Sequence, residues 1–414
     1  MKKLKIISNG LAKNDHQVYL PASKSESNRL LILEAISNKK SSIQNLSTAR
    51  DTQIMKRLLS SESDLYDVKD AGTVMRFLTA FLAINTEKSV TITGTDRMQK
   101  RPIGILVDSL KALGADIEYL NESGYPPLKI NPFKNQEKSQ IEIKSDVSSQ
   151  YISALMMIAP QLENGLEIKL IGKISSKPYI LMTRNLMKLF GVKAEFKPEI
   201  NLIKIESSSL KSCEYIVESD WSGASYWYEF LAISELNNLF LKGLRKHSFQ
   251  GDSALVDIYA QLGIRSEFKA EGVFLVKDRS LLPETLDYDF SNCPDLAQAV
   301  CISCATLGVK VKFTGLESLK IKETDRINAI DQELKKIGSA LLESDSVWEI
   351  VDRVEFNQQE AIEFQTYEDH RMAMCLAPLA SKFAVIIEEP EVVNKSYPEY
   401  WDELEKAGLS IEEV

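Results

Sequence analysis

The chain has 414 residues, of which 44% are hydrophobic and 26% are charged. These proportions exclude a disordered or fibrous chain, and the length predicts two or three globular domains. The net charge of −9, with no basic, aromatic-rich stripe in the sequence, argues against a nucleic-acid partner.

The N-terminal residues MKKLKIISNG contain lysines but no long apolar run follows them. A signal peptide needs an apolar run of about 7 to 15 residues, and a membrane-spanning helix needs about 20. We therefore expect neither feature in this segment. The protein is expected to be cytoplasmic and to have no membrane partner.

Six predicted helices that begin with a small or polar residue recur along the chain. After a shorter first interval, their starts lie about 74 residues apart. A strand that ends at a glycine or an acidic turn follows each of the last five, and a further helix closed by glycine comes next. The helices start at Ser25, Gly72, Ser148, Ser222, Asp295 and Asp369, and the closing glycines are Gly114, Gly191, Gly263, Gly338 and Gly408.

The helix starts, the strands that follow them and the helices closed by glycine recur together. This common spacing predicts an internal α/β repeat of helix, strand, helix, strand and strand. Coincidental spacing of helices could imitate one pair of such units, but not the whole series. The first copy is short, because only about a dozen residues between Arg57 and Asp70 stand in place of a strand pair, and we expect it to lack a β-hairpin. No unit of this size buries its own apolar faces, so two domains of three units each are expected.

The five cysteines favour buried free thiols over a metal or redox site. They are odd in number, and only three histidines accompany them. Cys301 and Cys304 form a C-x-x-C, but the motif lies inside an apolar helical run and has no second pair. We therefore assign no metal. The cysteines are Cys213, Cys293, Cys301, Cys304 and Cys375.

Basic residues lie at or near the predicted helix starts. There the free backbone N–H groups and the positive end of the helix dipole attract anions. A single arginine at such a position is more often a solvated surface residue, but the whole set, in register with the repeat, predicts a site for a multiply charged anion. The set comprises Lys24, Arg29, Arg76, Arg101, Lys177, Lys322, Arg326, Arg371 and Lys395.

The first two units contain three local patterns of this kind. Ser25 and Arg29 are four residues apart on one helix face, next to Lys24, so one anion could contact all three. Gly72 begins a helix where its lack of a side chain would let a phosphate or carboxylate approach the backbone. Arg101 precedes a proline, so its backbone is expected to be extended and its guanidinium able to bind a carboxylate in bidentate fashion.

Polar groups also precede the third predicted helix and its partner. Ser148, Ser149 and Gln150 supply hydroxyls and an amide ahead of an apolar helix, although either serine alone could equally well be an N-cap. Ser176 and Tyr179 form a second polar corner.

A group of charged residues follows in the fifth and sixth units. Lys322 and Arg326 are four residues apart on one helix face, where they repel each other unless an anion or Glu323 lies between them. Asp295 follows a proline at a helix start, where the dipole should lower the pKa of its carboxyl. In isolation Asp295 would be interpreted as a helix cap.

Nine segments resemble, in the same order, signature segments of EPSP synthases, a branch of the enolpyruvyl transferases. The resemblance spans about Leu20 to Tyr400, and its segments are LPASKSESNR, AGTVMR, KRPIG, VSSQYISALMM, SKPY, CPD, IKETDR, DHRMAM and NKSYPEY. It implies a two-domain inside-out α/β barrel of six βαβαββ repeats, the first of them truncated. One domain would combine residues 1–20 with 222–414, and residues 21–221 would form the inserted domain. The helix N-termini would face the cleft between them.

The resemblance also implies a reaction. The enolpyruvyl group of phosphoenolpyruvate would pass to the 5-hydroxyl of shikimate 3-phosphate, with release of phosphate, in the biosynthesis of chorismate and the aromatic amino acids. The hydroxyl would attack C2 while the methylene is protonated, and the adduct would then lose phosphate. Asp295 is implied as the base, Glu323 as the proton donor and Lys24 as an assisting group. A monomer that uses no cofactor is expected.

Site residues follow from the matching motifs. The residues implied to bind shikimate 3-phosphate are Lys24, Ser25, Arg29, Ser148, Ser149, Gln150, Ser176, Tyr179, Asp295, Ser318 and Lys322. Those implied to bind phosphoenolpyruvate are Lys24, Gly72, Arg101, Gln150, Arg326, Arg371 and Lys395. Two positions depart from the pattern, because Asp70 and Ser318 both stand where the family usually has asparagine. We expect the Asp70 carboxylate to turn away or to bond to the backbone.

Two alternatives compete with this interpretation. UDP-N-acetylglucosamine enolpyruvyl transferases share the fold, but they usually have a loop cysteine in the third unit, and none of the five cysteines lies within 103–145. A catalytically inactive scaffold protein could also retain the fold. The joint presence of Lys24, Asp295, Glu323 and Arg371 argues against a scaffold.

Overall fold

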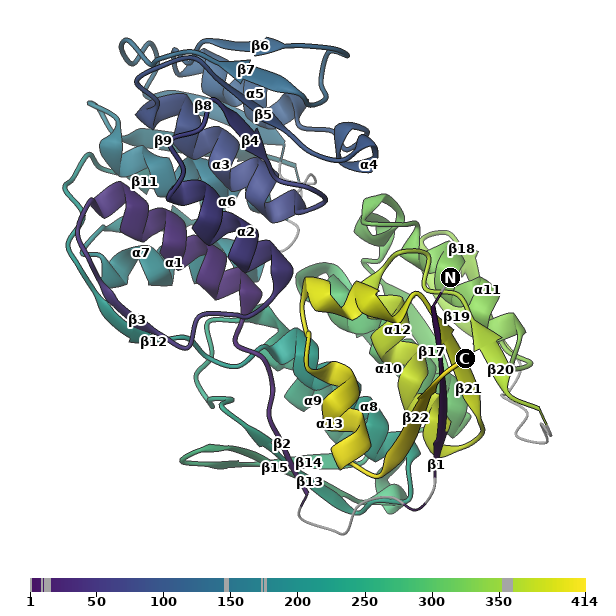
Figure 1. The fold of residues 1–414 in the computed structure, drawn as a ribbon. Coiled ribbons are helices and arrows are strands. Elements are labelled where there is room, and N and C mark those ends of the chain that lie inside the picture. Colours follow the sequence, from purple (N-terminus) through teal and green to yellow (C-terminus); the bar gives the residue numbers. More distant parts are fainter. Residues whose placement is uncertain are drawn as a thin grey trace. The chain divides into compact units, whose positions relative to one another are not determined.

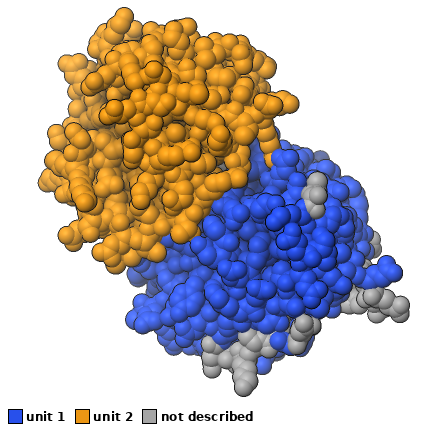
Figure 2. Space-filling model, in the orientation of Figure 1, with its two compact units in different colours: residues 1–22, 218–414 blue, residues 23–217 orange. Residues whose placement is uncertain are grey.

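The computed structural model describes residues 2–8, 10, 16–144, 149–172, 174, 177–351 and 360–414. They form two compact units, coloured separately in Figure 2. Unit 1 combines residues 1–22 with residues 218–414, and unit 2 comprises residues 23–217. The chain therefore leaves unit 1 after its first strands, completes unit 2, and returns.

Unit 2 alternates helices with short strands (Figure 1). Its helices are α1 (Lys24–Ser37), α2 (Arg50–Leu59), α3 (Gly72–Asn85), α4 (Asp96–Gln99), α5 (Gly104–Ala112), α6 (Ser149–Ile158) and α7 (Lys177–Leu189). Its strands are β3 (Ser42–Gln44), β4 (Leu65–Asp67), β5 (Val90–Thr93), β6 (Ile117–Tyr119), β7 (Leu128–Ile130), β8 (Gln140–Lys144), β9 (Leu166–Ile171), β10 (Ala194–Lys197), β11 (Leu202–Ile205) and β12 (Glu214–Ile216).

Unit 1 is built in the same way. Its helices are α8 (Trp221–Ile233), α9 (Leu255–Gln261), α10 (Ala297–Leu307), α11 (Arg326–Lys335), α12 (His370–Leu376) and α13 (Tyr400–Lys406). Its strands are β1 (Lys3–Ser8), β2 (Gln17–Val18), β13 (Asn238–Lys242), β14 (Ile264–Lys269), β15 (Gly272–Lys277), β16 (Thr285–Asp289), β17 (Lys310–Thr314), β18 (Ala340–Ser344), β19 (Val347–Val351), β20 (Ile362–Phe364), β21 (Val385–Glu388) and β22 (Leu409–Glu413).

Five four-stranded sheets of the described residues share one connectivity. In each, a parallel pair is extended by two antiparallel strands, as in β4-β5-β7-β6, where β4 runs parallel to β5 and β7 pairs antiparallel with both β5 and β6. A further sheet has only two strands, β3 and β12, which pair in parallel. Helix α2 leads directly into β4 of the next sheet, so no antiparallel pair follows α2 to extend this sheet. This short sheet is where the sequence has the shortened first copy of the repeat. The other sheets are β8-β9-β11-β10, β2-β13-β15-β14, β16-β17-β19-β18 and β20-β21-β1-β22.

The five glycines that the sequence assigned to helix ends all have positive φ, which confirms that assignment. Gly114, for example, follows α5 with φ 106°. A Cβ there would lie 2.4 Å from the carbonyl oxygen of Asn135, so no other residue fits without moving the backbone.

Each unit contains helices that are mostly or fully buried. In unit 1 the seven residues of α12 are all buried, and α8 buries every residue except Ser222. Strands β13, β17 and β21 pack against α8, α10 and α12 respectively. In unit 2 the corresponding buried helices are α1, α3 and α6. A helix that is apolar on most of its surface belongs in a core, and only its ends remain available for polar chemistry.

The cysteines are free and buried in the structure, which confirms the thiol interpretation. Burial raises the pKa of the Cys301 thiol to about 12, so it is not a reactive thiolate at neutral pH. None of the described helices is long and apolar enough to cross a membrane.

Candidate active site

In unit 1, the starts of α10, α11 and α12 bring charged side chains together. Asp295 lies in a short 3₁₀ turn, Pro294–Leu296, that leads into α10, and not in the helix itself as the sequence suggested, because the α-helical backbone begins only at Ala297. The carboxylate of Asp369 caps α12 by accepting the Arg371 backbone N–H at 2.9 Å. Arg326 is the first residue of α11.

Arg326 connects three carboxylates. Its Nε lies 2.7 Å from Oδ2 of Asp369, its Nη1 2.9 Å from Oδ1 of Asp295, and its Nη2 2.9 Å from Oε2 of Glu323. Burial alone would lower the pKa of this guanidinium, but the three carboxylates raise it. Arg326 is therefore a fixed cation that orients the acidic residues around it.

Asp295 is held by two arginines. Its second oxygen, Oδ2, accepts a hydrogen bond from Nη2 of Arg371 at 2.9 Å. Burial would raise the pKa of Asp295, but Arg371, Lys322 and Arg326 together hold it below its ordinary value. The direction agrees with the expectation from the sequence, whereas the cause is the neighbouring cations, with no contribution needed from a helix dipole. Asp295 is thus an ionised acceptor at neutral pH.

Glu323 and two lysines complete the group in unit 1. Oε1 of Glu323 lies 3.4 Å from Nζ of the buried Lys395. The sequence placed Lys322 and Arg326 on one helix face, but this is wrong, because α11 begins only at Arg326 and Lys322 follows the 3₁₀ turn Glu317–Ile321. Glu323 pairs with Arg326, as one of the two predicted arrangements required. Lys322 forms no ion pair within the described part of the chain; burial lowers the pKa of its ammonium, and Asp295 partly opposes that shift. Its charge remains available for an anionic ligand.

Two further residues at this site, Tyr226 and Asp252, escaped the sequence analysis. The hydroxyl of Tyr226 accepts a hydrogen bond from Nη1 of Arg371 at 3.3 Å. The buried Asp252 accepts one from the hydroxyl of Ser222, and burial and the charge of Asp295 raise the pKa of Asp252 to about 7. Tyr226 lies one turn after Ser222 on α8, a helical spacing that could have suggested it.

In unit 2, Arg29 is buried at the centre of the helices. Its Nε donates to Oγ1 of Thr183 at 2.8 Å, its Nη2 to Oγ of Ser153 at 3.0 Å, and its Nη1 to the carbonyl of Ser25 at 2.9 Å. The rings of Phe77 and Tyr179 flank it, with centroids 5.2 Å and 5.7 Å from Cζ. Burial lowers the pKa of Arg29 to about 10, so the guanidinium stays charged at neutral pH.

Lys24 pairs with a carboxylate that the sequence analysis did not name. Its Nζ lies 3.4 Å from Oδ2 of Asp51, which is buried in the first turn of α2. An acidic residue in a first helical turn is common, so nothing in the sequence distinguished Asp51 from an ordinary dipole partner.

The start of α3 lies against two guanidiniums. A Cβ at Gly72 would lie 2.7 Å from Nη1 of Arg101 and 2.7 Å from Nη1 of Arg76. Arg76 also donates to the carbonyl of Gly72 at 2.9 Å and lies over the ring of Tyr151. The absence of a side chain at position 72 therefore permits a close approach, as the sequence suggested, and the groups that approach are the two arginines.

Gln150, another predicted residue of unit 2, contacts the start of α3. Nε2 of Gln150 donates to Oγ1 of Thr73 at 3.0 Å, which joins the starts of α6 and α3. Ser149 begins α6 and is buried. Ser148 and Ser176 lie outside the described residues.

Asp70, one of the departures from the family pattern, is paired with a cation. Its Oδ2 lies 2.6 Å from Nη2 of Arg50. We expected the carboxylate to turn away or to bond to the backbone, and the sequence did not indicate the arginine. Ser318, the other departure, is half-buried in a 3₁₀ turn, Glu317–Ile321, of unit 1.

The predicted residues thus form two groups, each inside one unit. The group in unit 1 comprises Asp295, Lys322, Glu323, Arg326, Arg371 and Lys395. The group in unit 2 comprises Lys24, Ser25, Arg29, Gly72, Arg101, Ser149, Gln150 and Tyr179. Both groups offer cations at helix starts, which suits phosphate and carboxylate ligands.

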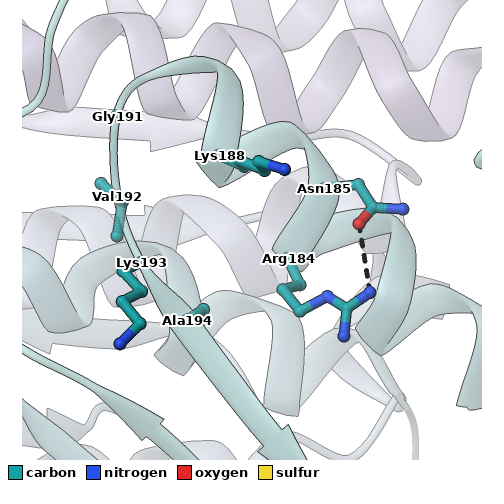
Figure 3. Close-up of a pocket in the computed structure, with 7 residues that line it drawn as sticks. All are labelled: Arg184, Asn185, Lys188, Gly191, Val192, Lys193 and Ala194. Atoms are coloured by element: carbon teal, nitrogen blue, oxygen red, sulfur yellow. Dashed lines mark hydrogen bonds between the residues drawn. The ribbon is translucent and has the colours of Figure 1, made fainter.

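A pocket of about 420 Å³ in unit 2 does not belong to this site (Figure 3). It lies where α7 ends and β10 begins, and none of its lining residues is a predicted site residue. Basic side chains such as Lys188 are favoured at the negative end of a helix, and Lys193 is paired with Glu195 at 2.7 Å. The lining residues are Arg184, Asn185, Lys188, Gly191, Val192, Lys193 and Ala194.

Comparison with known proteins gives one consistent relationship. The sequence profile of the family EPSP synthase (3-phosphoshikimate 1-carboxyvinyltransferase) matches residues 56–404. A Bacteroides fragilis protein named 3-phosphoshikimate 1-carboxyvinyltransferase is 49% identical over 95% of both chains. A Histophilus somni protein of the same name is 33% identical over 97% of this chain and 98% of its own.

A solved structure shares the fold. The EPSP synthase from Acinetobacter baumannii superposes with a TM-score of 0.81 over the whole of both chains, at 19% sequence identity. The family profile covers most of the chain, and the relatives match it at nearly full length. The chain therefore belongs to the EPSP synthase family.

Proposed function

We propose that the chain transfers the enolpyruvyl group of phosphoenolpyruvate to the 5-hydroxyl of shikimate 3-phosphate and releases phosphate, in the biosynthesis of chorismate and the aromatic amino acids. Membership of the family supports the reaction. The observation that carries it is the ionised Asp295, fixed between the guanidiniums of Arg326 and Arg371 at the starts of α11 and α12. A reacting hydroxyl needs a base, and an anionic partner needs cations. Asp295 beside the two arginines offers both.

Phosphoenolpyruvate has a carboxylate and a phosphate, and planar guanidiniums bind both in bidentate fashion. Arg326 and Arg371 would bind it in unit 1. In unit 2, the α3 start and its arginines would contribute backbone N–H groups and positive charge. The full proposed set is Lys24, Gly72, Arg101, Gln150, Arg326, Arg371 and Lys395.

Shikimate 3-phosphate needs a phosphate site and partners for its hydroxyls. Lys322, which lacks an ion-pair partner among the described residues, would supply charge, and Asp295 would accept the 5-hydroxyl hydrogen. The full proposed set is Lys24, Ser25, Arg29, Ser148, Ser149, Gln150, Ser176, Tyr179, Asp295, Ser318 and Lys322.

Asp295 is the proposed base. In the free protein both of its oxygens accept guanidinium N–H groups, so it is a weak base. An anionic substrate that shares these guanidiniums weakens their hold on Asp295 and raises the pKa of the carboxyl. Binding of phosphoenolpyruvate therefore prepares the base before the hydroxyl attacks C2.

Glu323 is the proposed proton donor to the methylene carbon of phosphoenolpyruvate, and Lys24 assists. Arg326 and Lys395 hold one carboxyl oxygen each, which fixes the direction of Glu323. Phosphoenolpyruvate, by sharing Arg326 and Lys395 with Glu323, lets the Glu323 carboxylate take up a proton from water. The hydroxyl proton passes to Asp295 as the new C–O bond forms, and protonated Glu323 gives its proton to the methylene carbon. The adduct then breaks its C–O bond to phosphate, Glu323 takes a proton back from the methyl group so that the double bond is restored, and the proton on Asp295 leaves with the phosphate.

The sheet pattern supports six βαβαββ repeats in an inside-out α/β barrel, with the two-stranded sheet as the truncated first repeat. We propose the domain borders 1–20 with 222–414, and 21–221, for this repeat arrangement. We further propose a cytoplasmic monomer that acts on these two small molecules without a cofactor.

The reaction is tested by measuring phosphate release from phosphoenolpyruvate with shikimate 3-phosphate or with UDP-N-acetylglucosamine as acceptor. We expect release only with shikimate 3-phosphate. Release with the UDP-sugar alone would assign the chain to the sister activity, and release with neither acceptor would contradict the proposal.

Glu323→Gln tests the proton donor, because the amide keeps the size of the side chain but cannot donate an acidic proton. We expect kcat to fall about 100-fold or more. Glu317→Gln, an exposed position in the same segment, is the control and should keep full turnover. Full turnover of Glu323→Gln would remove Glu323 from this role.

A further inference from the structure

Asp70 places a carboxylate beside the proposed phosphoenolpyruvate site of unit 2. It lies two residues before Gly72, the first residue of α3, where the guanidiniums of Arg76 and Arg101 lie close to the backbone. A carboxylate near a helix N-terminus suits the helix dipole, but it repels a second anion at the same place. An anion site here therefore needs the charge of Asp70 to be offset.

Arg50 provides that offset. Its Nη2 lies 2.6 Å from Oδ2 of Asp70, and it is the first residue of α2, which packs against both α1 and α3. The next residue, Asp51, pairs with Lys24. The first turn of α2 thus pairs with Lys24 of the proposed site through Asp51, and with Asp70 beside the site through Arg50.

We infer that Arg50 is a positioning residue of this site, which neutralises Asp70 and so keeps the start of α3 able to bind the phosphate or carboxylate of phosphoenolpyruvate. The inference rests on the proposed function. Arg50 contacts no substrate in this scheme, so its loss acts on the KM for phosphoenolpyruvate and leaves kcat nearly unchanged. The side chains of Arg50 and Asp70 are 49% and 32% exposed, so the pair contributes little to stability.

A double-mutant cycle in the full chain tests the inference. In Arg50→Ala the Asp70 carboxylate loses its ion pair with Arg50, and we expect the KM for phosphoenolpyruvate to rise about three- to tenfold, the effect of one partly screened charge at short range. Adding Asp70→Asn should return the KM to the wild-type value, and Arg50→Lys should retain it. The increase in Arg50→Ala should shrink as salt is added, because exposed charges are screened.

Arg57→Ala is the matched control, since Arg57 is an exposed arginine in the last turn of the same helix. It should leave the KM unchanged. A KM that stays raised in the Arg50→Ala/Asp70→Asn double variant would overturn the inference, because the cause would then be the helix and not the carboxylate. An unchanged KM in Arg50→Ala would overturn it as well. If the wild-type chain releases no phosphate, it is the proposed function that fails, and binding of phosphoenolpyruvate by the same variants, measured by calorimetry, tests Arg50 separately.

Discussion

Arg29 of unit 2 is held in a different way from Arg326 and Arg371 of unit 1. In unit 1, both arginines are bound by carboxylates, and Asp295 contacts each of them. In unit 2, Arg29 is bound by hydroxyls, a carbonyl and aromatic rings, and Arg76 donates to the carbonyl of Gly72.

The difference assigns separate tasks to the two groups. An anion that binds Arg326 or Arg371 must share the guanidinium with Asp295, so in the proposed reaction its binding would change the state of Asp295. Arg29, held by neutral groups, keeps its full charge, whereas Lys24 of the same unit pairs with Asp51. In the proposed reaction Arg29 would therefore supply positive charge, and the two arginines of unit 1 would couple charge recognition to proton transfer.

The largest expected effect comes from Asp295→Asn, which removes the acceptor that links Arg326 to Arg371. An amide cannot accept the hydroxyl proton, so we expect kcat to fall by a factor of about 10² to 10⁴ in a phosphate-release assay. Removing one partner of a buried ion pair should also cost about 3 to 5 kcal/mol of folding free energy, measured by denaturant unfolding.

Asp287→Asn, at an exposed position of β16, is the control for Asp295→Asn and should change neither quantity. If Asp295→Asn retained wild-type turnover, Asp295 would not be the base, and unit 1 would not couple anion binding to proton transfer.

A smaller effect is expected from Gly72→Ala in unit 2. The new methyl group would lie 2.7 Å from Nη1 of both Arg76 and Arg101, and these flexible ends would move aside. We expect the KM for phosphoenolpyruvate to rise about tenfold, the cost of one weakened charged hydrogen bond, with a smaller change in kcat.

Gly223→Ala serves as the control for Gly72→Ala, because Gly223 also lies in the first turn of a buried helix but a Cβ there has no neighbour closer than 3.7 Å. Equal KM values for Gly72→Ala and the wild type would mean that the two arginines do not contact the ligand in unit 2.

The smallest expected effect on turnover concerns Glu229, a fully buried carboxyl on α8 that, unlike Asp295, has no hydrogen-bond partner in the described structure. Burial raises the pKa of Glu229 well above its ordinary value. The protonated carboxyl favours the folded state at a pH below its unfolded-state pKa, and this contribution is lost as the pH rises toward the folded-state pKa. Glu229→Met should therefore stabilise the protein more at about pH 8 than at about pH 5, by about 1 to 3 kcal/mol.

Thermal melting at the two pH values measures the effect of Glu229→Met, with the exposed Glu284→Met as control. A lower melting temperature for Glu229→Met at both pH values would show that the carboxyl has a partner that stabilises it.

Much of the fold could be predicted from the sequence because its turns impose local constraints. Gly114 needs a positive φ and space for a neighbouring carbonyl, and such requirements recur once per repeat. The insertion of β1 between β21 and β22 could not be predicted, since strands from opposite ends of the chain leave no local mark where they pair.

The site could be predicted only in part, for a related reason. Cations at helix starts are visible because the helix itself explains why an anion binds there. The partners of these cations could not be predicted. Thr183, which accepts a hydrogen bond from Arg29, lies 154 residues away in the sequence, and no sequence motif marks it. Asp51 and Arg50 were missed because a first helical turn commonly contains charged residues, whatever their tertiary contacts.

The position of β1 has a consequence for biosynthesis on the ribosome. Residues 23–217 contain every strand of their own sheets, so unit 2 can be complete before residues 218–414 have been made. Strand β1 precedes unit 2 along the chain, but its native partners are Val385–Glu388 and Leu409–Glu413, which are made after unit 2. The β1 segment therefore stays without its native partners while the whole of unit 2 and most of unit 1 are synthesised.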